Sequence, residues 1–447
     1  MKKVIRAFKI AAVNMVILVV LVEAASIGTY FFQTGTFFYG HSTHRKIAST
    51  SLPLVAANQG SVQQVPAQLH PYFGFATQPG IEFQSTYSQA THVSNNSGFW
   101  SKYPYPFKRQ HSNQFIVGVF GGSVAAQYSF FAAERNTLAA ELKKLPALAN
   151  KEIIILPYAL GAYKQPQQLI VLSYFLSIGQ DFDLVINIDG FNEVALSYIN
   201  YRNGLDSSMP CSYVIVPLVN LATCNGSEEE LQLTLDVIRN RKRFEDSIKS
   251  METSRFATGY VMAWLRARFA ERRYRQDVVN LDRLRTSATK SGQSYMLFPT
   301  RPNPGEDQVF AETVFNWSSS SLLMKELLDR RNTPYFQFIQ PNQYEPTDRT
   351  FTENERAIAI SGASDFRTGV LKGYPLLLAE LVKLQQAGVN AQSAINVFDN
   401  VSEPVYEDNC CHYNERGNEI FGAYVANTIR QALSKNSRYQ LPATLDK

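Results

Sequence analysis

The sequence predicts an α/β fold in which helices cover both faces of a central parallel sheet. From Phe115 onward, short apolar runs alternate with longer segments that have the spacing of helices. The runs are apolar nearly throughout, as is typical of strands that are buried on both faces. The chain has 447 residues, of which 45% are hydrophobic, and this is enough for a large core.

Each run along the chain is assigned to one element. Strands are expected at Phe115–Phe120, Glu152–Leu156, Asp183–Ile188, Tyr335–Gln340 and Ile395–Phe398. Helices are expected at Ala132–Leu145, Gln167–Ser177, about 226–290, Val309–Arg330, Pro375–Ala387 and Glu415–Leu433. Pro375 and Gly388 bracket one of these helices, which is the usual asymmetry of helix ends. Residues His70–Trp100 contain short aromatic stretches and are expected to pack on the body as irregular structure.

The N-terminal segment has the pattern of a membrane anchor. Four basic residues within positions 1–9 precede the apolar stretch Ile10–Phe32, whose only charged residue is Glu23. At 1.5 Å per residue this stretch can cross a bilayer core of ~30 Å. The basic flank predicts a cytoplasmic N-terminus and a body that is periplasmic or extracellular. A signal peptide cleaved before Ala25 is the alternative.

The formal net charge of +5 is concentrated in this flank. Its four basic residues leave 5 − 4 = +1 for the rest of the chain. General nucleic-acid binding needs a concentrated basic surface, so no nucleic-acid partner is expected. The basic stretches Arg239–Arg243 and Arg266–Arg275 could face an anionic glycan or a membrane surface, or form a solvated helix face.

These patterns predict six regions along the chain. They are a cytoplasmic tail (1–9), a transmembrane anchor (10–32), a stalk (33–68), an N-terminal packing segment (69–114), a main domain (115–435) with a helical insertion (about 195–330), and a C-terminal tail (436–447).

Four cysteines suit an oxidising compartment. Cys211 and Cys224 could close a loop, or one or both could pair with the adjacent Cys410 and Cys411, and the sequence does not choose among these pairings. No pair has the CxxC spacing, and the six histidines are scattered, mostly toward the N-terminus. We therefore expect no metal and no cofactor.

Polar residues follow the expected strands, where the sites of parallel sheets form. Ser123 follows the first strand in "GGS", Gly161 follows the second, and Asn192 follows the third in "DGFNE". Asp408 and His412 follow the last strand in "EDNCCHYNERGNE". A hydroxyl, hydrogen-bond donors and an imidazole beside a carboxylate together provide the groups needed for acyl transfer.

The order of these blocks resembles the SGNH hydrolases, also called GDSL-like esterases, over roughly residues 115–435. "VFGGSVA", "LGAYKQPQQL", "NIDGFNE" and "CCHYNERGNEIFG" are similar to the Ser, Gly, Asn and His blocks of that family. The resemblance implies a flavodoxin-like three-layer α/β/α sandwich. Two positions depart from the family pattern: Gly122 replaces the usual Asp before Ser123, and Asn409 stands where the family has its acid.

The resemblance implies a role for each site residue. Ser123 would be the nucleophile, His412 the base and Asp408, one position early, the acid that orients it. The backbone N–H groups of Ser123 and Gly161, with the Asn192 side chain, would form the oxyanion hole. A Ser–His dyad without Asp408 is an alternative.

Each residue also has a purely structural interpretation. Ser123 could cap the following helix, and Gly161 could only allow a tight turn. Asn192 could form an Asx turn, and His412 could be a buried structural histidine.

The expected function is that of an extracytoplasmic serine esterase. It would remove acyl groups from cell-surface or exported polysaccharide, or from another ester substrate. An O-acyltransferase would use the same residues. A non-catalytic glycan-binding or assembly protein that keeps the fold is a further alternative, motivated by Asn409. The sequence leaves the acyl group, the acceptor and the oligomeric state open.

Overall fold

The computed structural model describes residues 2–39, 67–84, 91–222, 228–289, 304–362 and 364–440. The chain divides into two compact units, one formed by Met1–Gln63 and Thr223–Tyr295 and the other by Gln64–Ala222 and Met296–Lys447. Most of the expected stalk and Cys224 lie outside the described residues.

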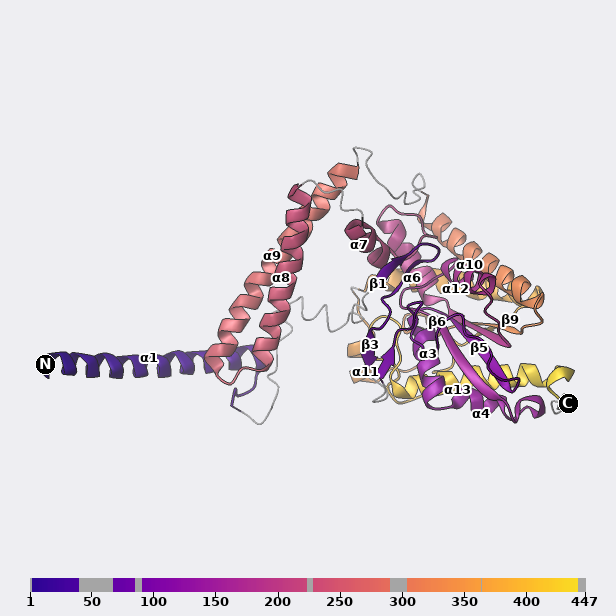
Figure 1. Cartoon of the computed structure of the whole chain (residues 1–447), viewed down its shortest axis with the longest axis horizontal. Coiled ribbons are helices and arrows are strands. Elements are labelled where there is room, and N and C mark those ends of the chain that lie inside the picture. The colour runs from indigo at the N-terminus through magenta and orange to yellow at the C-terminus, as the bar shows by residue number, and fades with distance from the viewer. Residues whose placement is uncertain are drawn as a thin grey trace. The chain divides into compact units, whose positions relative to one another are not determined.

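The second unit is built on a five-stranded sheet (Figure 1). Its strands are β5 (Gln114–Gly121), β6 (Glu152–Ala159), β7 (Leu184–Asp189), β8 (Tyr335–Ile339) and β9 (Asn390–Ser393). All neighbouring pairs are parallel, in the order β6-β5-β7-β8-β9. β5, β7 and β8 are buried along their whole length, which explains their uninterrupted apolar sequences. The predicted α/β class with a central parallel sheet is confirmed.

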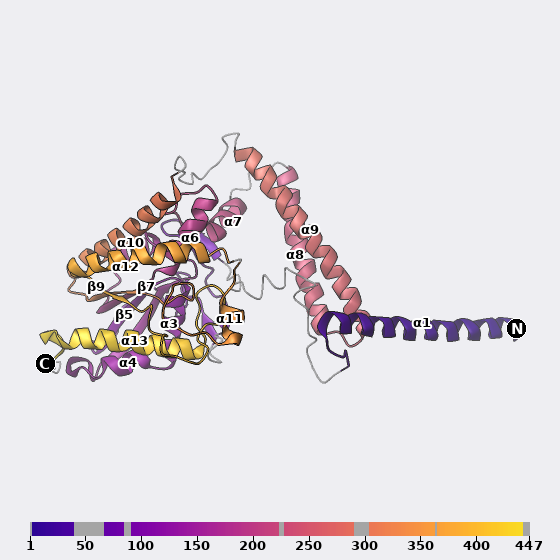
Figure 2. The same cartoon turned by 180° about the vertical axis from the view of Figure 1, so that it is seen from behind.

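Helices cover both faces of this sheet (Figures 1 and 2). On one side lie α3 (Ser123–Glu134), α4 (Thr137–Leu142) and α13 (Glu415–Ser434). On the other lie α5 (Gln167–Ser177), α6 (Phe191–Arg202), α10 (Glu306–Asp329) and α12 (Arg367–Gln386). Shorter helical elements are α7 (Ser212–Ala222), α11 (Glu353–Ala359), η2 (Pro146–Leu148) and η3 (Ser437–Tyr439).

Three expected elements differ from the structure. The last strand is β9, while residues 395–398 form turns whose apolar side chains pack into the core. The first helix starts at Ser123 and is interrupted at Asn136, whose φ of 56° is left-handed. The helix expected to start at Pro375 begins at Arg367 and contains the proline in its interior. Proline is common at the first position of a helix, but here the helix accommodates it internally, so Pro375 does not mark the start.

The segment before β5 is more regular than expected. It contains two antiparallel pairs, β1 (Ala67–His70) with β2 (Gly74–Thr77) and β3 (Glu82–Gln84) with β4 (Thr91–Val93). Strands of three or four residues are too short to show a period-2 pattern in the sequence, which explains the missed prediction.

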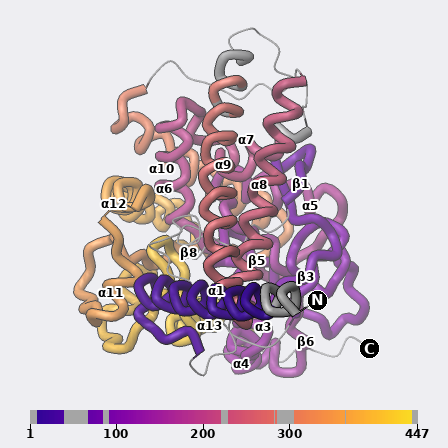
Figure 3. The backbone as a smooth tube through the Cα atoms, turned by 90° about the vertical axis from the view of Figure 1, so that its left-hand side faces the viewer, coloured from indigo at the N-terminus to yellow at the C-terminus, as the bar shows by residue number. Residues whose placement is uncertain are grey.

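The described part of the first unit contains three long helices. α1 (Lys2–Thr34) includes a span, Lys9–Thr34, that is long and apolar enough to cross a membrane. α8 (Glu228–Glu252) and α9 (Ala257–Thr289) lie side by side as a hairpin (Figure 3). The Glu23 carboxylate accepts the backbone N–H groups of Ala257 and Thr258 at the start of α9. The region expected as one insertion is therefore divided, because α6, α7 and α10 belong to the second unit.

Candidate active site

Ser123 lies at the carboxyl end of β5, where the strand turns directly into α3. Gly122 is the N-cap residue and Ser123 the first residue of the helix, and no side chain caps this end. Gly121 permits the turn: its φ is +138°, and a Cβ there would lie 2.0 Å from the Ile188 carbonyl oxygen. The interpretation of Ser123 as the helix cap is therefore wrong, and its hydroxyl is left for other contacts.

The structure brings Ser123, His412 and Asp408 into one hydrogen-bonded line. The Ser123 Oγ lies 2.7 Å from His412 Nε2, and His412 Nδ1 lies 2.5 Å from Asp408 Oδ2. An ionised carboxylate can only accept, so the proton of Nδ1 points to Asp408 and Nε2 is the acceptor for the serine hydroxyl. This is the arrangement that lets a histidine take a proton from serine.

The loop before α13 explains how Asp408 reaches His412 although it lies one residue before the position, Asn409, at which the acid was expected. Asp408 Oδ1 accepts the backbone N–H groups of Cys410, Cys411 and His412 at 2.9, 3.0 and 3.2 Å. These three bonds fold the loop back over the carboxylate and absorb the additional residue. The departure at Asn409 therefore leaves the contact between acid and imidazole intact.

Charges in this loop shift the pKa values of its groups. Burial alone would lower the pKa of His412, but the charges of Cys411 and Asp408 outweigh it and raise that pKa well above its usual range. Burial would raise the pKa of Asp408, but the His412 charge and hydrogen bonds lower it. The acid is therefore ionised at neutral pH and stabilises the protonated imidazole.

The Asn192 side chain lies next to the residue before Ser123. It is buried near the start of α6, and its Nδ2 donates to the Tyr163 carbonyl oxygen at 2.8 Å. A Cβ on Gly122 would lie 2.1 Å from that nitrogen, so glycine at this position makes room for the amide. Asn192 is thus a helix residue rather than an Asx-turn residue, and one proton of its amide is left for a further acceptor.

Glu193 connects the turn after β6 to the turn after β7. This buried carboxylate accepts the backbone N–H of Gly190 at 2.7 Å and that of Gln165 at 3.0 Å. It also accepts from the Gln168 side chain at 3.0 Å. Because Tyr163 and Asn192 lie in the two connected segments, these bonds fix the position of the Asn192 amide.

Gly161 lies in an exposed turn after β6. No atom beyond its chain neighbours would come within 4 Å of a Cβ at this position. The left-handed residue of the turn is the next one, Ala162, with a φ of 67°. The turn therefore does not require glycine here, and the expected oxyanion role of the Gly161 N–H stays a prediction.

Sequence reasoning missed the residues that hold the acid loop in place. Asn342, Gln343 and Tyr344 follow β8, and their side chains donate hydrogen bonds of 2.9, 3.0 and 2.9 Å to the backbone carbonyls of residues 408–410. The available signal was their place after the fourth strand, the same rule that found the other site residues.

The described cysteines Cys211, Cys410 and Cys411 are free thiols. Cys411 Sγ lies 4.0 Å from Ser123 Oγ and 3.5 Å from Cys410 Sγ. Ligand atoms of Cys410, Cys411 and His412 lie within 4.8 Å of one another, a spacing that a metal ion would accept. Both nitrogens of His412 already contact Asp408 and Ser123, so a metal would have to displace one of these contacts, and we assign none.

Comparison with known proteins adds no identification. No family model matches the chain, and no curated protein matches it.

Proposed function

We propose that this chain is a membrane-anchored serine esterase of the SGNH type that acts outside the cytoplasm. The observation that carries the proposal is the line Ser123–His412–Asp408, with 2.7 Å between Ser123 Oγ and His412 Nε2. The strand order across the sheet is 2-1-3-4-5 when the strands are numbered along the chain, and this order supports a flavodoxin-like three-layer α/β/α sandwich. Parallel sheets of this kind carry their sites at the carboxyl ends of the strands, where these residues lie.

The proposed reaction has two halves. In the first, His412 Nε2 takes the Ser123 proton while Oγ attacks the ester carbonyl carbon, and the tetrahedral intermediate collapses as His412 returns the proton to the leaving alcohol. In the second, His412 takes a proton from water, the hydroxide oxygen attacks the acyl-serine, and the carboxylic acid leaves as Oγ regains its proton. Asp408 stabilises the imidazolium in both halves.

The oxyanion would be held by donors at the start of α3 and α6. The backbone N–H of Ser123 lies at a helix N-terminus, where the partial positive charge favours an anion. Asn192 Nδ2 has one proton beyond its bond to Tyr163, and the Gly161 N–H is the third donor in the proposal. Removing one such donor typically costs ~3 kcal/mol of transition-state stabilisation.

The proposed substrate is an acylated cell-surface or exported polysaccharide. An N-terminal span long enough to cross a membrane, preceded by basic residues, supports a periplasmic or extracellular location for the second unit. The alternative of a non-catalytic glycan-binding protein was motivated by Asn409. Because Asp408 reaches His412 Nδ1 at 2.5 Å, that departure gives the alternative no support.

The test is covalent labelling of the full chain in detergent with a fluorophosphonate, which reacts with activated serines. Wild type should be labelled and should hydrolyse an aryl acetate, whereas Ser123→Ala and His412→Ala should do neither. Ser129→Ala is the matched control, because Ser129 is on the same helix and its Oγ donates to the Ala125 carbonyl at 2.8 Å. Folded wild type without labelling or hydrolysis would contradict the proposal. Acyl transfer to a sugar alcohol, in place of release to water, would identify an acyltransferase.

A further inference from the structure

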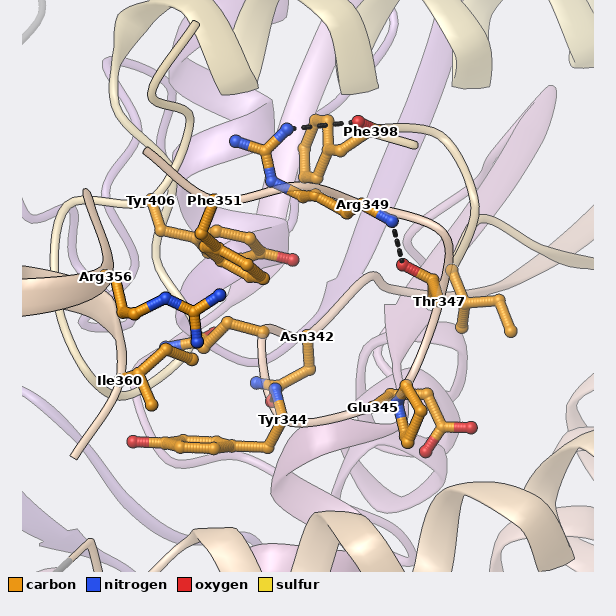
Figure 4. Close-up of a pocket in the computed structure, with 13 residues that line it drawn as sticks. Asn342, Tyr344, Glu345, Thr347, Arg349, Phe351, Arg356, Ile360, Phe398 and Tyr406 are labelled. Carbon is orange, nitrogen blue, oxygen red and sulfur yellow. Dashed lines mark hydrogen bonds between the residues drawn. The ribbon is translucent and has the colours of Figure 1, made fainter. Parts of the chain in front are cut away.

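A cavity lies beside the acid loop, residues 408–412, of the candidate active site. It has a volume of about 200 Å³ and is shown in Figure 4. Its walls come from the segment after β8, from α11 and from the loops before His412. They include Tyr344, Glu345, Phe351, Arg356, Phe398 and Tyr406.

The cavity and the candidate active site share a wall. Asn342 and Tyr344 line the cavity, and the same side chains donate to the carbonyls of Cys410 and Asn409. Gln343, also in the wall, donates to the Asp408 carbonyl at 3.0 Å. A ligand in the cavity would therefore contact the residues that hold Asp408 in position.

The cavity is lined by two arginines, of which one is paired with an acid. Arg349 is paired with Glu355 at 2.7 Å, and both side chains are almost fully buried. Arg356, by contrast, is exposed, and its guanidinium forms no hydrogen bond or ion pair with any residue that the structure describes; it lies 5.7 Å from the Phe351 ring centroid. Figure 4 shows the Arg356 side chain extending among the cavity residues. Burial raises the pKa of Glu345 to about 7, so at neutral pH this acid is only partly ionised, and its protonated form can donate a proton to a ligand.

Aromatic rings form part of the remaining wall. The rings of Tyr344, Phe351 and Tyr406 line the cavity between the polar groups (Figure 4). Aromatic walls with a few placed polar groups are typical of small-molecule sites, in which the apolar area gives affinity and the polar groups fix orientation. Pyranose rings have apolar faces that pack on aromatic rings and hydroxyls that need donors and acceptors at the edge.

We infer that this cavity binds a carboxylate-bearing sugar ring, a hexuronate, with Arg356 holding the carboxylate and the aromatic rings holding the pyranose. An arginine fork matches the two oxygens of a carboxylate, and a neutral sugar offers no anion to pair with it. The volume is below the ~300–1,000 Å³ of pockets that enclose drug-sized ligands, so it suits one ring. The assignment of this ring to an acylated polymer rests on the proposed function, whereas the binding site itself does not.

The test measures ligand binding to the full-length Ser123→Ala protein in detergent. This variant is used because it lacks the proposed nucleophile and cannot hydrolyse an ester. Glucuronate, glucose and acetate are titrated separately by calorimetry. Glucuronate should bind at least about tenfold more tightly than either of the others, because only it offers both ring and charge. Arg356→Gln in the same background should weaken glucuronate at least about tenfold, and Arg356→Lys less. Arg438→Gln is the control, because this exposed arginine contacts the Asn332 carbonyl, before β8 begins.

Equal affinity for glucuronate and glucose, or an unchanged affinity in Arg356→Gln, would overturn the inference. Acetate binding as tightly as glucuronate would overturn the sugar assignment. Aryl acetate hydrolysis by wild type separates the two proposals. Hydrolysis without glucuronate binding would refute only the cavity, and binding through Arg356 without hydrolysis or labelling would refute only the esterase.

Discussion

Ser123 Oγ and His412 Nε2 lie 2.7 Å apart although the two residues are 289 positions apart in the chain. Ser123 is fixed by the turn from β5 into α3, and His412 by the loop that precedes α13. Because α13 packs against α3, the two ends of the contact belong to helices on the same face of the sheet. The contact therefore forms only when the sheet and these two helices are correctly folded. Substitutions of the residues around it test the proposed chemistry.

Asp408→Asn is expected to lower kcat for aryl acetate by about 10³- to 10⁴-fold. The amide cannot stabilise the imidazolium and favours the tautomer with the proton on the wrong nitrogen. Glu407→Gln is the matched control, because the carboxylate of this neighbouring acid accepts from the Gln127 side chain and its bond to His412 is made by the backbone, which the substitution keeps. Steady-state kinetics of both variants beside wild type measure the effect. Similar losses in the two variants, or none in Asp408→Asn, would mean that His412 works without this acid.

Much of this site could be predicted from sequence because each residue follows a strand. The strands β5, β7 and β8 are buried on both faces, so their apolar runs are unmistakable, and the rule that sites lie at strand ends then locates Ser123 and Asn192. His412 can be predicted because it is the only histidine after position 111 and precedes the last expected helix.

The rest depends on tertiary contacts that leave no local pattern. β9, with the sequence "NAQS", has weak strand propensity and forms because β8 offers an edge to pair with. Asp408 reaches His412 because three backbone N–H groups fold its loop, which the number of intervening residues does not reveal. The need for glycine at position 122 follows from the Asn192 amide that lies beside it, and Asn192 belongs to the start of α6, far away in the sequence.

The pH dependence of kcat/KM should reveal the influence of Cys411. His412 must be neutral to act as a base, so activity should fall as the pH drops through its pKa, which lies above the ordinary value of ~6.5. Burial raises the pKa of Cys411, but the hydrogen bond from Cys410 and the His412 charge lower it to about 6, so its thiolate helps to keep His412 protonated. Cys411→Ala should therefore move the acidic limb to lower pH.

The matched control for this profile is Cys211→Ser, because Cys211 is not among the groups that shift the His412 pKa. Its acidic limb should coincide with that of wild type. Movement of the Cys411→Ala limb to higher pH, or no movement, would contradict the assigned electrostatics.

Gly122→Ala is expected to lower kcat by about 10²-fold, the size of effect seen when one oxyanion donor is lost. The added Cβ would lie 2.1 Å from Asn192 Nδ2, so the amide must move away from the position in which it would donate to the proposed oxyanion. Gly161→Ala is the control: it keeps the backbone N–H, and its Cβ meets no atom within 4 Å. Kinetics of the two variants measure the difference. Equal activities would show that the Asn192 position is unimportant for the reaction.

Loss of the ion pair between Arg349 and Glu355 should lower the free energy of unfolding far more than loss of a surface ion pair does. The side chains are 3% and 0% exposed and 2.7 Å apart, and Glu355 also accepts the backbone N–H groups of Val405 and Tyr406. Arg349→Met would leave this carboxylate buried without its cation, which typically costs about 3–5 kcal/mol. The measurement is the free energy of unfolding in urea, followed by tryptophan fluorescence.

Lys383→Met provides the comparison, because Lys383 pairs with Glu380 on the surface at the same distance of 2.7 Å but is 70% exposed. Solvent screens such a pair, so its loss should cost no more than about 1 kcal/mol. Equal losses of unfolding free energy in the two variants would show that burial of Arg349 and Glu355 is not what gives their pair its importance. A large loss in Arg349→Met alone would show that this pair holds the strand-end segment and the loop that leads to Asp408 together.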